Sequence, residues 1–217
     1  MFIGHFAVGF ASKRWAPRTS LAVLLAAPLL ADILWPAFIL MGVEHARIVT
    51  GDTPFLNISL DDYPWSHSLL MLAVWALCFG GAVWGYAKDR AAGLVVAIGV
   101  LSHWVLDWIT HRPDMPLWPG GPEYGLGLWN SVRGTVTLEC VMLAVGVSFY
   151  VAATRAKDRI GRLALAGMVG VLAILYVASI YSPPPPGMTA VGAVGLAMTA
   201  IFLMWAHWID RHREPAR

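Results

Sequence analysis

Three polar side chains recur at intervals of four within one strongly apolar stretch of this sequence. They are His103, Asp107 and His111, and the residues between them include Trp104 and Ile109. An α-helix turns once every 3.6 residues, so positions four apart lie nearly above one another and form one stripe. Imidazole and carboxylate groups suit zinc and manganese. We therefore expect the stripe to face a partner, a cavity or a metal ion.

The composition around this stripe is that of an integral membrane protein. The chain has 217 residues, of which 58% are hydrophobic and 13% charged, and its mean hydropathy is +0.64. Soluble domains average about 25% charged residues. The net charge of +2 is too small to indicate a nucleic-acid partner. Cys78 and Cys140 lie singly in apolar segments, where we expect buried thiols and no disulfide framework.

The hydropathy pattern predicts an all-α, polytopic membrane bundle with about six transmembrane helices. A bilayer core of about 30 Å needs roughly 20 helical residues. The segments of that length are residues 20–42, 66–87, 91–111, 131–153, 163–182 and 188–209. Residues 2–12 are apolar but too short to span, and we expect a re-entrant helix there. Residues 1–153 form the predicted metal-bearing core, and residues 154–217 add two further helices to the same domain.

The positive charges favour one orientation in the membrane. Of the 15 Lys and Arg residues, only Arg47, Arg112 and Arg133 fall on the side opposite the others. Because basic loops stay in the cytoplasm, we expect the first basic turn and the C-terminal segment to be cytoplasmic. This orientation places two loops on the outer side. We expect the loop at 43–64 to be polar and the loop at 112–130 to be irregular.

Ionisable residues from separate segments come out at a similar depth. Counting at 1.5 Å per residue puts four of them roughly 18–24 Å above the cytoplasmic ends of their helices: Asp32, His103, Asp107 and Glu139. The short first helix places His5 near mid-membrane, and His67 starts its helix nearer the outer surface. Intramembrane ionisable residues are costly and mark functional sites, so the group favours a metal site. The alternative is that the histidines and acids only pair with each other and hold the bundle together.

Two of the ionisable residues have more than one interpretation. Glu139 is a predicted general base, and it is also able to serve as a metal ligand or as a satisfied acceptor between helices. His111 precedes Arg112-Pro113 at a helix end, where histidine commonly contacts the C-terminal carbonyl groups. A metal or substrate contact is the other interpretation of His111.

Four short motifs occur in order along residues 1–140. They are Gly4-His5, Leu30-Ala31-Asp32, Pro64-Trp65-Ser66-His67-Ser68 and Ser102-His103-x-x-x-Asp107-x-x-Thr110-His111. In these motifs the chain resembles the bacterial inner-membrane proteins called membrane-bound metal-dependent hydrolases. The order is similar to that of zinc-dependent phospholipases C and single-strand nucleases, in which such residues bind zinc ions that cleave phosphodiesters. The resemblance implies that the metal ligands here are His5, Asp32, His67, His103 and Asp107.

The chain departs from the zinc-dependent enzymes at two positions. Thr135 stands where a histidine accompanies their later glutamate, and the chain begins Met1-Phe2 where they have a zinc-ligating Trp. We therefore expect one or two divalent ions in place of three. Zinc is the expected ion, and manganese is the alternative.

Together these features predict a membrane-embedded, metal-dependent hydrolase that acts on a phosphate ester of a lipid or lipid-linked substrate. Asp107 and Glu139 are the predicted catalytic residues, and membrane lipid is the expected partner. His111, Arg112 and Arg133 are the predicted substrate contacts, because a guanidinium holds a phosphate by a bidentate contact. One rival is a transporter or proton- or metal-ion-translocating protein, which predicts titratable residues continuing towards the cytoplasm. The other is a non-catalytic structural membrane protein, which predicts no bound metal.

Overall fold

The structure is a computed structural model that describes residues 1–50, 53, 55 and 57–216. Residues 51–52, 54, 56 and 217 lie outside the described part, and with them part of the predicted loop 43–64 and the last basic residue. The helices are α1 (Ile3–Ser12), α2 (Leu21–Ala26), α3 (Leu30–Met41), α4 (Pro64–His67), α5 (Leu69–Ala87), α6 (Arg90–Thr110), η1 (Leu128–Asn130), α7 (Val132–Ala153), α8 (Arg159–Ile180) and α9 (Met188–Arg211). The short strands pair as β1 (His45–Ile48) with β2 (Ile58–Asp62), β3 (Met115–Pro116) with β4 (Glu123–Tyr124), and β5 (Thr154–Ala156) with β6 (Arg213–Pro215).

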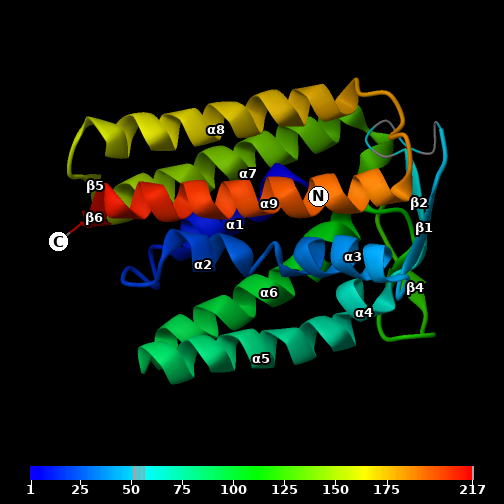
Figure 1. Cartoon of the computed structure of the whole chain (residues 1–217), viewed down its shortest axis with the longest axis horizontal. Coiled ribbons are helices and arrows are strands. Elements are labelled where there is room, and N and C mark those ends of the chain that lie inside the picture. Colours follow the sequence, from blue (N-terminus) through cyan, green and yellow to red (C-terminus); the bar gives the residue numbers. More distant parts are fainter. Residues whose placement is uncertain (51–52, 54, 56, 217) are drawn as a thin grey trace.

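The long helices confirm the predicted all-α membrane bundle, with one correction. Five helices of the described chain are long and apolar enough to cross a membrane, namely α5, α6, α7, α8 and α9. The expected span at 20–42 is instead two short helices, α2 and α3, which follow one another end to end in Figure 1. The break contains Pro28, which has no amide hydrogen to continue the hydrogen-bond ladder of α2. The first span is therefore a broken helix.

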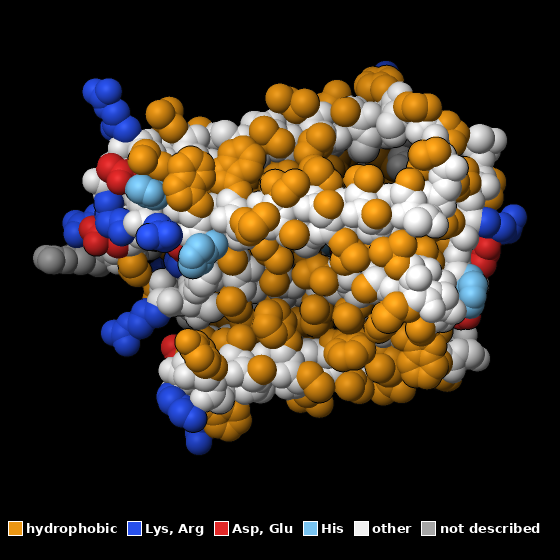
Figure 2. Space-filling view, viewed as in Figure 1, with side chains coloured by type: hydrophobic (Ala, Val, Ile, Leu, Met, Phe, Trp, Pro, Cys, Tyr) orange, Lys and Arg blue, Asp and Glu red, His pale blue; other side chains and the backbone are white. Residues whose placement is uncertain are grey.

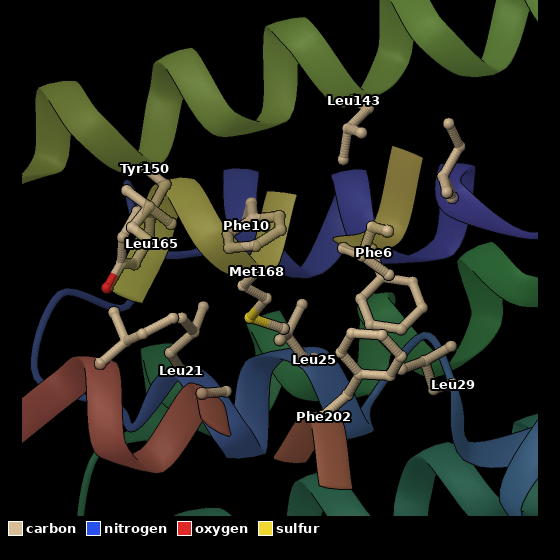
Figure 3. Close-up of a cluster of buried hydrophobic side chains, with 14 of the residues drawn as sticks. Phe6, Phe10, Leu21, Leu25, Leu29, Leu143, Tyr150, Leu165, Met168 and Phe202 are labelled. Carbon is tan, nitrogen blue, oxygen red and sulfur yellow. The ribbon is translucent and has the colours of Figure 1, made fainter. Parts of the chain in front are cut away.

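Helix α1 is the short helix expected at residues 2–12, and it lies buried inside the bundle. Its closest neighbour is α7, which it meets where Gly146 leaves room for its backbone. A Cβ added at Gly146 would lie 2.3 Å from the carbonyl oxygen of Ala7, so only glycine fits there. Phe6 and Phe10 of α1 are almost fully buried. They belong to an apolar cluster that also takes side chains from α2, α7, α8 and α9 (Figure 3).

The sides of the bundle are apolar, as the outer surface of a membrane protein must be. Leu77 of α5, Leu163 and Ile174 of α8 are each at least two-thirds exposed. Hydrophobic side chains also cover the face seen in Figure 2. Cys78 and Cys140 are both exposed, so the expectation of buried thiols is wrong. Each cysteine lies on the exposed face of a helix that also exposes other apolar side chains.

The two ends of the bundle differ in charge. The end that carries β5 and β6 gathers most of the Lys and Arg side chains visible in Figure 2. The other end carries the two hairpins β1–β2 and β3–β4 (Figure 1). In the predicted polar loop 43–64, the described residues include an antiparallel pair with Ala46 opposite Leu60 and Ile48 opposite Ile58. Half of that loop is therefore a hairpin that covers the less basic end.

Candidate metal centre

The stripe predicted on α6 is present and buried. Asp107 lies between the two histidines, with its Oδ2 atom 3.0 Å from Nε2 of His103 and 3.4 Å from Nε2 of His111. His103 and Asp107 are at most 3% exposed. One helical turn on each side of Asp107 thus supplies an imidazole, as the spacing of four predicts.

Helix α1 adds a third imidazole from the opposite side. Nε2 of His5 lies 3.0 Å from Oδ1 of Asp107, and the rings of His5 and His103 stack with their centroids 4.1 Å apart. The amino group of Met1 also donates to Oδ1 of Asp107. Asp107 is therefore the acid that the stripe and α1 share.

Glu139 of α7 holds the first turn of α1 in place. Its Oε2 atom accepts hydrogen bonds from the backbone amides of Phe2, at 2.9 Å, and Gly4, at 3.0 Å. The first amides of a helix have no partner within the helix, so this carboxylate satisfies two of them from another element. The position of His5 thus depends on Glu139.

Asp32 and His67 complete the group. Nε2 of His67 lies 3.9 Å from Oδ1 of Asp32, and the His67 ring lies 5.0 Å from the His103 ring, at a steep angle. His67 is the last residue of α4, and Ser68 then caps α5 by accepting from the amide of Met71. This break between two helices turns His67 into the bundle.

The five predicted metal ligands therefore meet in one place. We call them the metal-residue cluster: His5, Asp32, His67, His103 and Asp107. They form two overlapping groups that could each hold an ion, one of His5, His103 and Asp107 and one of Asp32, His67 and His103. Within each group the potential ligand atoms lie within 4.8 Å of one another. His103 belongs to both groups.

The break between α2 and α3 orients His103. Its Nδ1 atom lies 2.8 Å from the carbonyl oxygen of Pro28. A carbonyl oxygen only accepts, so Nδ1 carries a proton and Nε2 faces the carboxylates. Within the described residues, the buried Nε2 of His103 makes no hydrogen bond, although Oδ2 of Asp107 lies 3.0 Å away. With the proton on Nδ1, Nε2 presents a lone pair to that carboxylate oxygen, so two acceptors face each other. A ring fixed at one nitrogen and left with a free lone pair at the other is the usual state of a metal-binding histidine.

Two residues that the sequence interpretation did not include orient His67. Glu44 accepts from the amide of Ser66 at 2.8 Å and from its hydroxyl at 2.6 Å. The Ser66 oxygen in turn lies 2.7 Å from Nδ1 of His67, which therefore donates to it. Burial raises the pKa of Glu44 above its ordinary value, and the hydrogen bonds from Ser66 oppose this rise. The motif Ser66-His67 was visible in the sequence, but nothing in the spacing pointed to Glu44.

Of the three predicted substrate contacts, only His111 reaches the cluster. Its Nδ1 atom lies 3.0 Å from Oδ1 of Asp114, and its ring lies against that of Trp129. Arg112 instead donates to Asp114 at 3.0 Å and to Ser59 at 3.2 Å. Arg133 lines a shallow depression on the outer surface of α7. Neither arginine is among the residues that line the cavity next to the cluster.

A cavity of about 230 Å³ adjoins the metal-residue cluster. Its polar side chains include Asp32, His67, Asp107, His111 and Glu139. Its aromatic wall consists of Phe2, Trp35, Phe55, Trp129 and Tyr176. Two residues of β2, Ile58 and Leu60, also line it, which places it at the hairpin end of the bundle. Concave sites of this kind, mostly apolar with a few convergent polar groups, are typical of binding sites for small molecules.

Comparison with known proteins gives one match. The model of the family described as YdjM inner membrane protein matches residues 1–185. This range runs from α1 to the end of α8 and includes the whole metal-residue cluster. Neither the curated proteins nor the solved structures give a match. The comparison supports an inner-membrane protein and does not extend to a hydrolase or to a phospholipase C.

Proposed function

This chain belongs to the YdjM inner membrane protein family, and on that premise we propose that it is a membrane-embedded, divalent-metal-dependent hydrolase. Its substrate in this proposal is a phosphate ester of a lipid or lipid-linked molecule. The observation that carries the proposal is the metal-residue cluster itself. Four separate elements, α1, α3, α4 and α6, bring histidines and aspartates within ligand distance of one another.

The residues present fit a divalent ion. The buried Nε2 atom of His103 faces Oδ2 of Asp107 at 3.0 Å without a hydrogen bond, and a cation bound by both atoms would satisfy the two acceptors. Three protein ligands would be enough to hold a zinc ion, since catalytic zinc sites typically have three protein ligands. Manganese accepts the same nitrogen and oxygen ligands. Both groups need His103, whose one available nitrogen could bind a single ion, so a second ion would have only two ligands from its group. We propose one or two ions.

A bound divalent ion would supply Lewis-acid activation of water and of the phosphoryl group. The chain's own residues do the rest of the work in this proposal. Ser66, held by Glu44, fixes the ring of His67, and the carbonyl of Pro28 fixes that of His103. Glu139 holds the first turn of α1 and also lines the cavity, where its carboxylate can accept a proton from the attacking water.

The location of the cavity supports a lipid-borne substrate. The basic end of the bundle is the cytoplasmic end if the usual charge bias holds, and the cavity lies at the other end, beside the hairpin β1–β2. His111 faces this cavity and is the proposed substrate contact. We propose that Arg112 acts indirectly, since it shares Asp114 with His111. Arg133, on the outer surface of the same end, is the proposed contact for an approaching headgroup.

The packing below the cluster favours hydrolysis over transport. A transporter needs a polar path from the cluster towards the basic end. Along α1 the next inward-facing side chains after His5 are Phe6 and Phe10, which are buried in the apolar cluster of Figure 3. Along α1, therefore, apolar side chains follow the cluster where a translocation path would need polar ones.

Turnover of lipid phosphate in vesicles tests the proposal. Purified protein is placed in phosphatidylglycerol vesicles that contain phosphatidic acid or phosphatidylethanolamine, and released phosphate or phosphorylated headgroup is measured. We expect zinc-dependent release that a chelator abolishes, that added zinc restores and that Asp107→Asn removes. His207→Ala, at an exposed histidine of the basic end, is the matched control and keeps full activity. Folded, zinc-supplied protein that releases nothing from either lipid, or that is insensitive to Asp107→Asn, would overturn the proposal.

A further inference from the structure

A second cavity, of about 280 Å³, opens between α7 and α8 on the side of the bundle. Its lining is almost entirely apolar and includes Cys140, Ala144, Val147, Ala173, Val177 and, from α1, Ile3. We call it the α7–α8 groove. Ala144, Ala173 and Val177 are exposed, so the groove is open to the surroundings of the bundle. Within a membrane those surroundings are lipid.

The length of the groove matches one leaflet of a bilayer. On α7 it runs from Val136 to Val147, and on α8 from Val169 to Ile180. Each stretch is about 16 Å long at 1.5 Å per residue. Half of the hydrocarbon core of a bilayer is about 15 Å. The groove thus extends over the depth that the acyl chains of a single leaflet occupy.

Tyr176 connects this groove with the cavity of the metal centre. The residue lines both cavities and is 2% exposed. On the side of the metal centre its ring lies 6.1 Å from that of Phe2 and is stacked on that of Phe55 at 6.3 Å. One aromatic side chain therefore borders both the polar cavity and the apolar groove. The two spaces together have the arrangement of a polar headgroup and its hydrocarbon tail.

We propose that the α7–α8 groove binds an acyl chain of a membrane phospholipid whose phosphate lies in the cavity beside His67, Asp107 and His111. The inference rests on the proposed function for the headgroup end and adds the route: the lipid enters sideways from its own leaflet, between α7 and α8. The occupant is hydrocarbon because the groove offers shape and apolar surface but almost no hydrogen-bonding groups. Tyr176 then lies at the junction of headgroup and tail.

Photocrosslinking with a lipid probe tests the groove directly. The probe is phosphatidic acid with a diazirine in one acyl chain, in phosphatidylglycerol vesicles, and the labelled positions are mapped by peptide mass spectrometry. We expect label on Cys140, Ala144, Ala173 and Val177 in excess of label around Cys78, which is also an exposed thiol, on α5. Label spread evenly over α5 and the groove would overturn the proposal.

Filling the groove sharpens the test. Ala173→Phe should lower labelling between α7 and α8 by roughly tenfold, the size of effect that a misfit in an apolar pocket produces, and leave labelling of α5 unchanged. Ala144→Phe fills the groove from α7 and should lower labelling between α7 and α8 to a similar extent. Ala178→Phe changes an exposed alanine of α8 outside the groove and should have no effect. Unchanged groove labelling in both filled variants, with α5 labelling intact, would contradict acyl-chain binding.

The labelling needs no metal and no turnover, so it separates the two proposals. Focused labelling in protein that hydrolyses nothing even when supplied with zinc would keep the groove and reject the hydrolase. Metal-dependent hydrolysis without focused labelling would keep the hydrolase and reject the groove. With both proposals correct, Ala173→Phe slows hydrolysis of the vesicle lipid while Ala178→Phe does not.

Discussion

Helix α1 has a buried polar cluster at each end, and the two clusters differ in how their polar atoms are satisfied. Directly after its last turn, Lys13 donates to the carbonyl of Thr19 at 2.7 Å and to Asp210 at 3.1 Å. Asp210 also accepts from the amide of Leu21. Nearby, Arg213 donates to the hydroxyl of Thr154 and to two backbone carbonyls. This basic-end network satisfies its charges with protein groups alone.

The metal-residue cluster at the other end of α1 is different. Nε2 of His103 and Nδ1 of His5 are buried and make no hydrogen bond within the described residues. Buried polar groups are hydrogen-bonded in the great majority of cases, and exceptions indicate strain, function or an absent ion. The comparison teaches that burial and charge alone do not distinguish a structural network from a binding site. Unsatisfied ring nitrogens that belong to a group of potential metal ligands do, whereas the unsatisfied hydroxyl of Tyr150, beside Arg213 at the basic end, belongs to no such group among the described residues.

Breaking the basic-end network should have the largest effect on stability. Removing one partner of a buried ion pair costs about 3–5 kcal/mol, and the side chains of Lys13 and Asp210 are 6% and 18% exposed. We expect Lys13→Met to lower the thermal unfolding temperature strongly and to leave zinc content per folded chain unchanged. Arg14→Met, at the exposed neighbouring position, is the control. If Lys13→Met lost zinc but kept its stability, the basic-end network would be a metal site and not a structural network, which would contradict the comparison.

Removing the metal should destabilise the protein through the other cluster. At free zinc 100-fold above its Kd, binding to the folded state adds about 2.7 kcal/mol to the free energy of unfolding. A chelator should therefore lower the unfolding temperature of the wild type and have no effect on His103→Ala, which lacks the ligand common to both groups. An equal response of both proteins would show that the stabilising ion binds elsewhere.

The hydrogen bonds that orient His67 should have an intermediate effect. Loss of a partner behind a metal-binding histidine typically lowers metal affinity by about 10–100-fold. We expect this for Ser66→Ala and, through Ser66, for Glu44→Gln, measured by competition with a zinc indicator. Glu123→Gln changes an exposed glutamate of the same end and should keep the wild-type affinity. Wild-type affinity in both orienting variants would show that His67 is placed without their help.

The smallest effect concerns Asp158 at the basic end. Hydrogen bonds from His212 and from the amide of Gly161 hold the pKa of Asp158 below its ordinary value. Because the folded-state pKa is the lower one, this carboxylate stabilises the fold above about pH 4 and loses that contribution as the pH falls further. Asp158→Ser keeps a cap for α8 but cannot titrate. Its unfolding temperature should fall less than that of the wild type between about pH 5 and pH 3, and parallel curves would contradict the assignment.

The sequence predicted those residues of the candidate site whose positions follow from the periodicity of a single helix or from their depth in the membrane. The stripe of His103, Asp107 and His111 follows from helical periodicity alone. His5 and Asp32 followed from depth in the membrane and from the order of the motifs. The break at Pro28 was missed, because residues 20–42 are apolar enough to be read as one span whose interruptions are Asp32 and Pro36, and Pro36 lies inside α3.

The contacts that arise from tertiary structure were beyond the sequence. Glu44 lies 22 residues before Ser66, with the hairpin β1–β2 between them, so no periodic pattern relates the two. The exposure of Cys78 and Cys140 was missed because a helix facing lipid is apolar all round, and its pattern does not show which side is buried. The expected phosphate contacts of Arg112 and Arg133 rested on which loop they occupy, and a loop position does not determine where a side chain lies.

The central claim is that a cation draws the metal-residue cluster together, and metal content tests it most directly. Wild type, His103→Ala and Asp32→Ala are purified without chelator, and metal per folded chain is determined by elemental mass spectrometry. We predict one or two zinc or manganese ions per wild-type chain, none in His103→Ala and a reduced content in Asp32→Ala. A fully folded wild type that holds no divalent metal, even after incubation with zinc, would contradict the account.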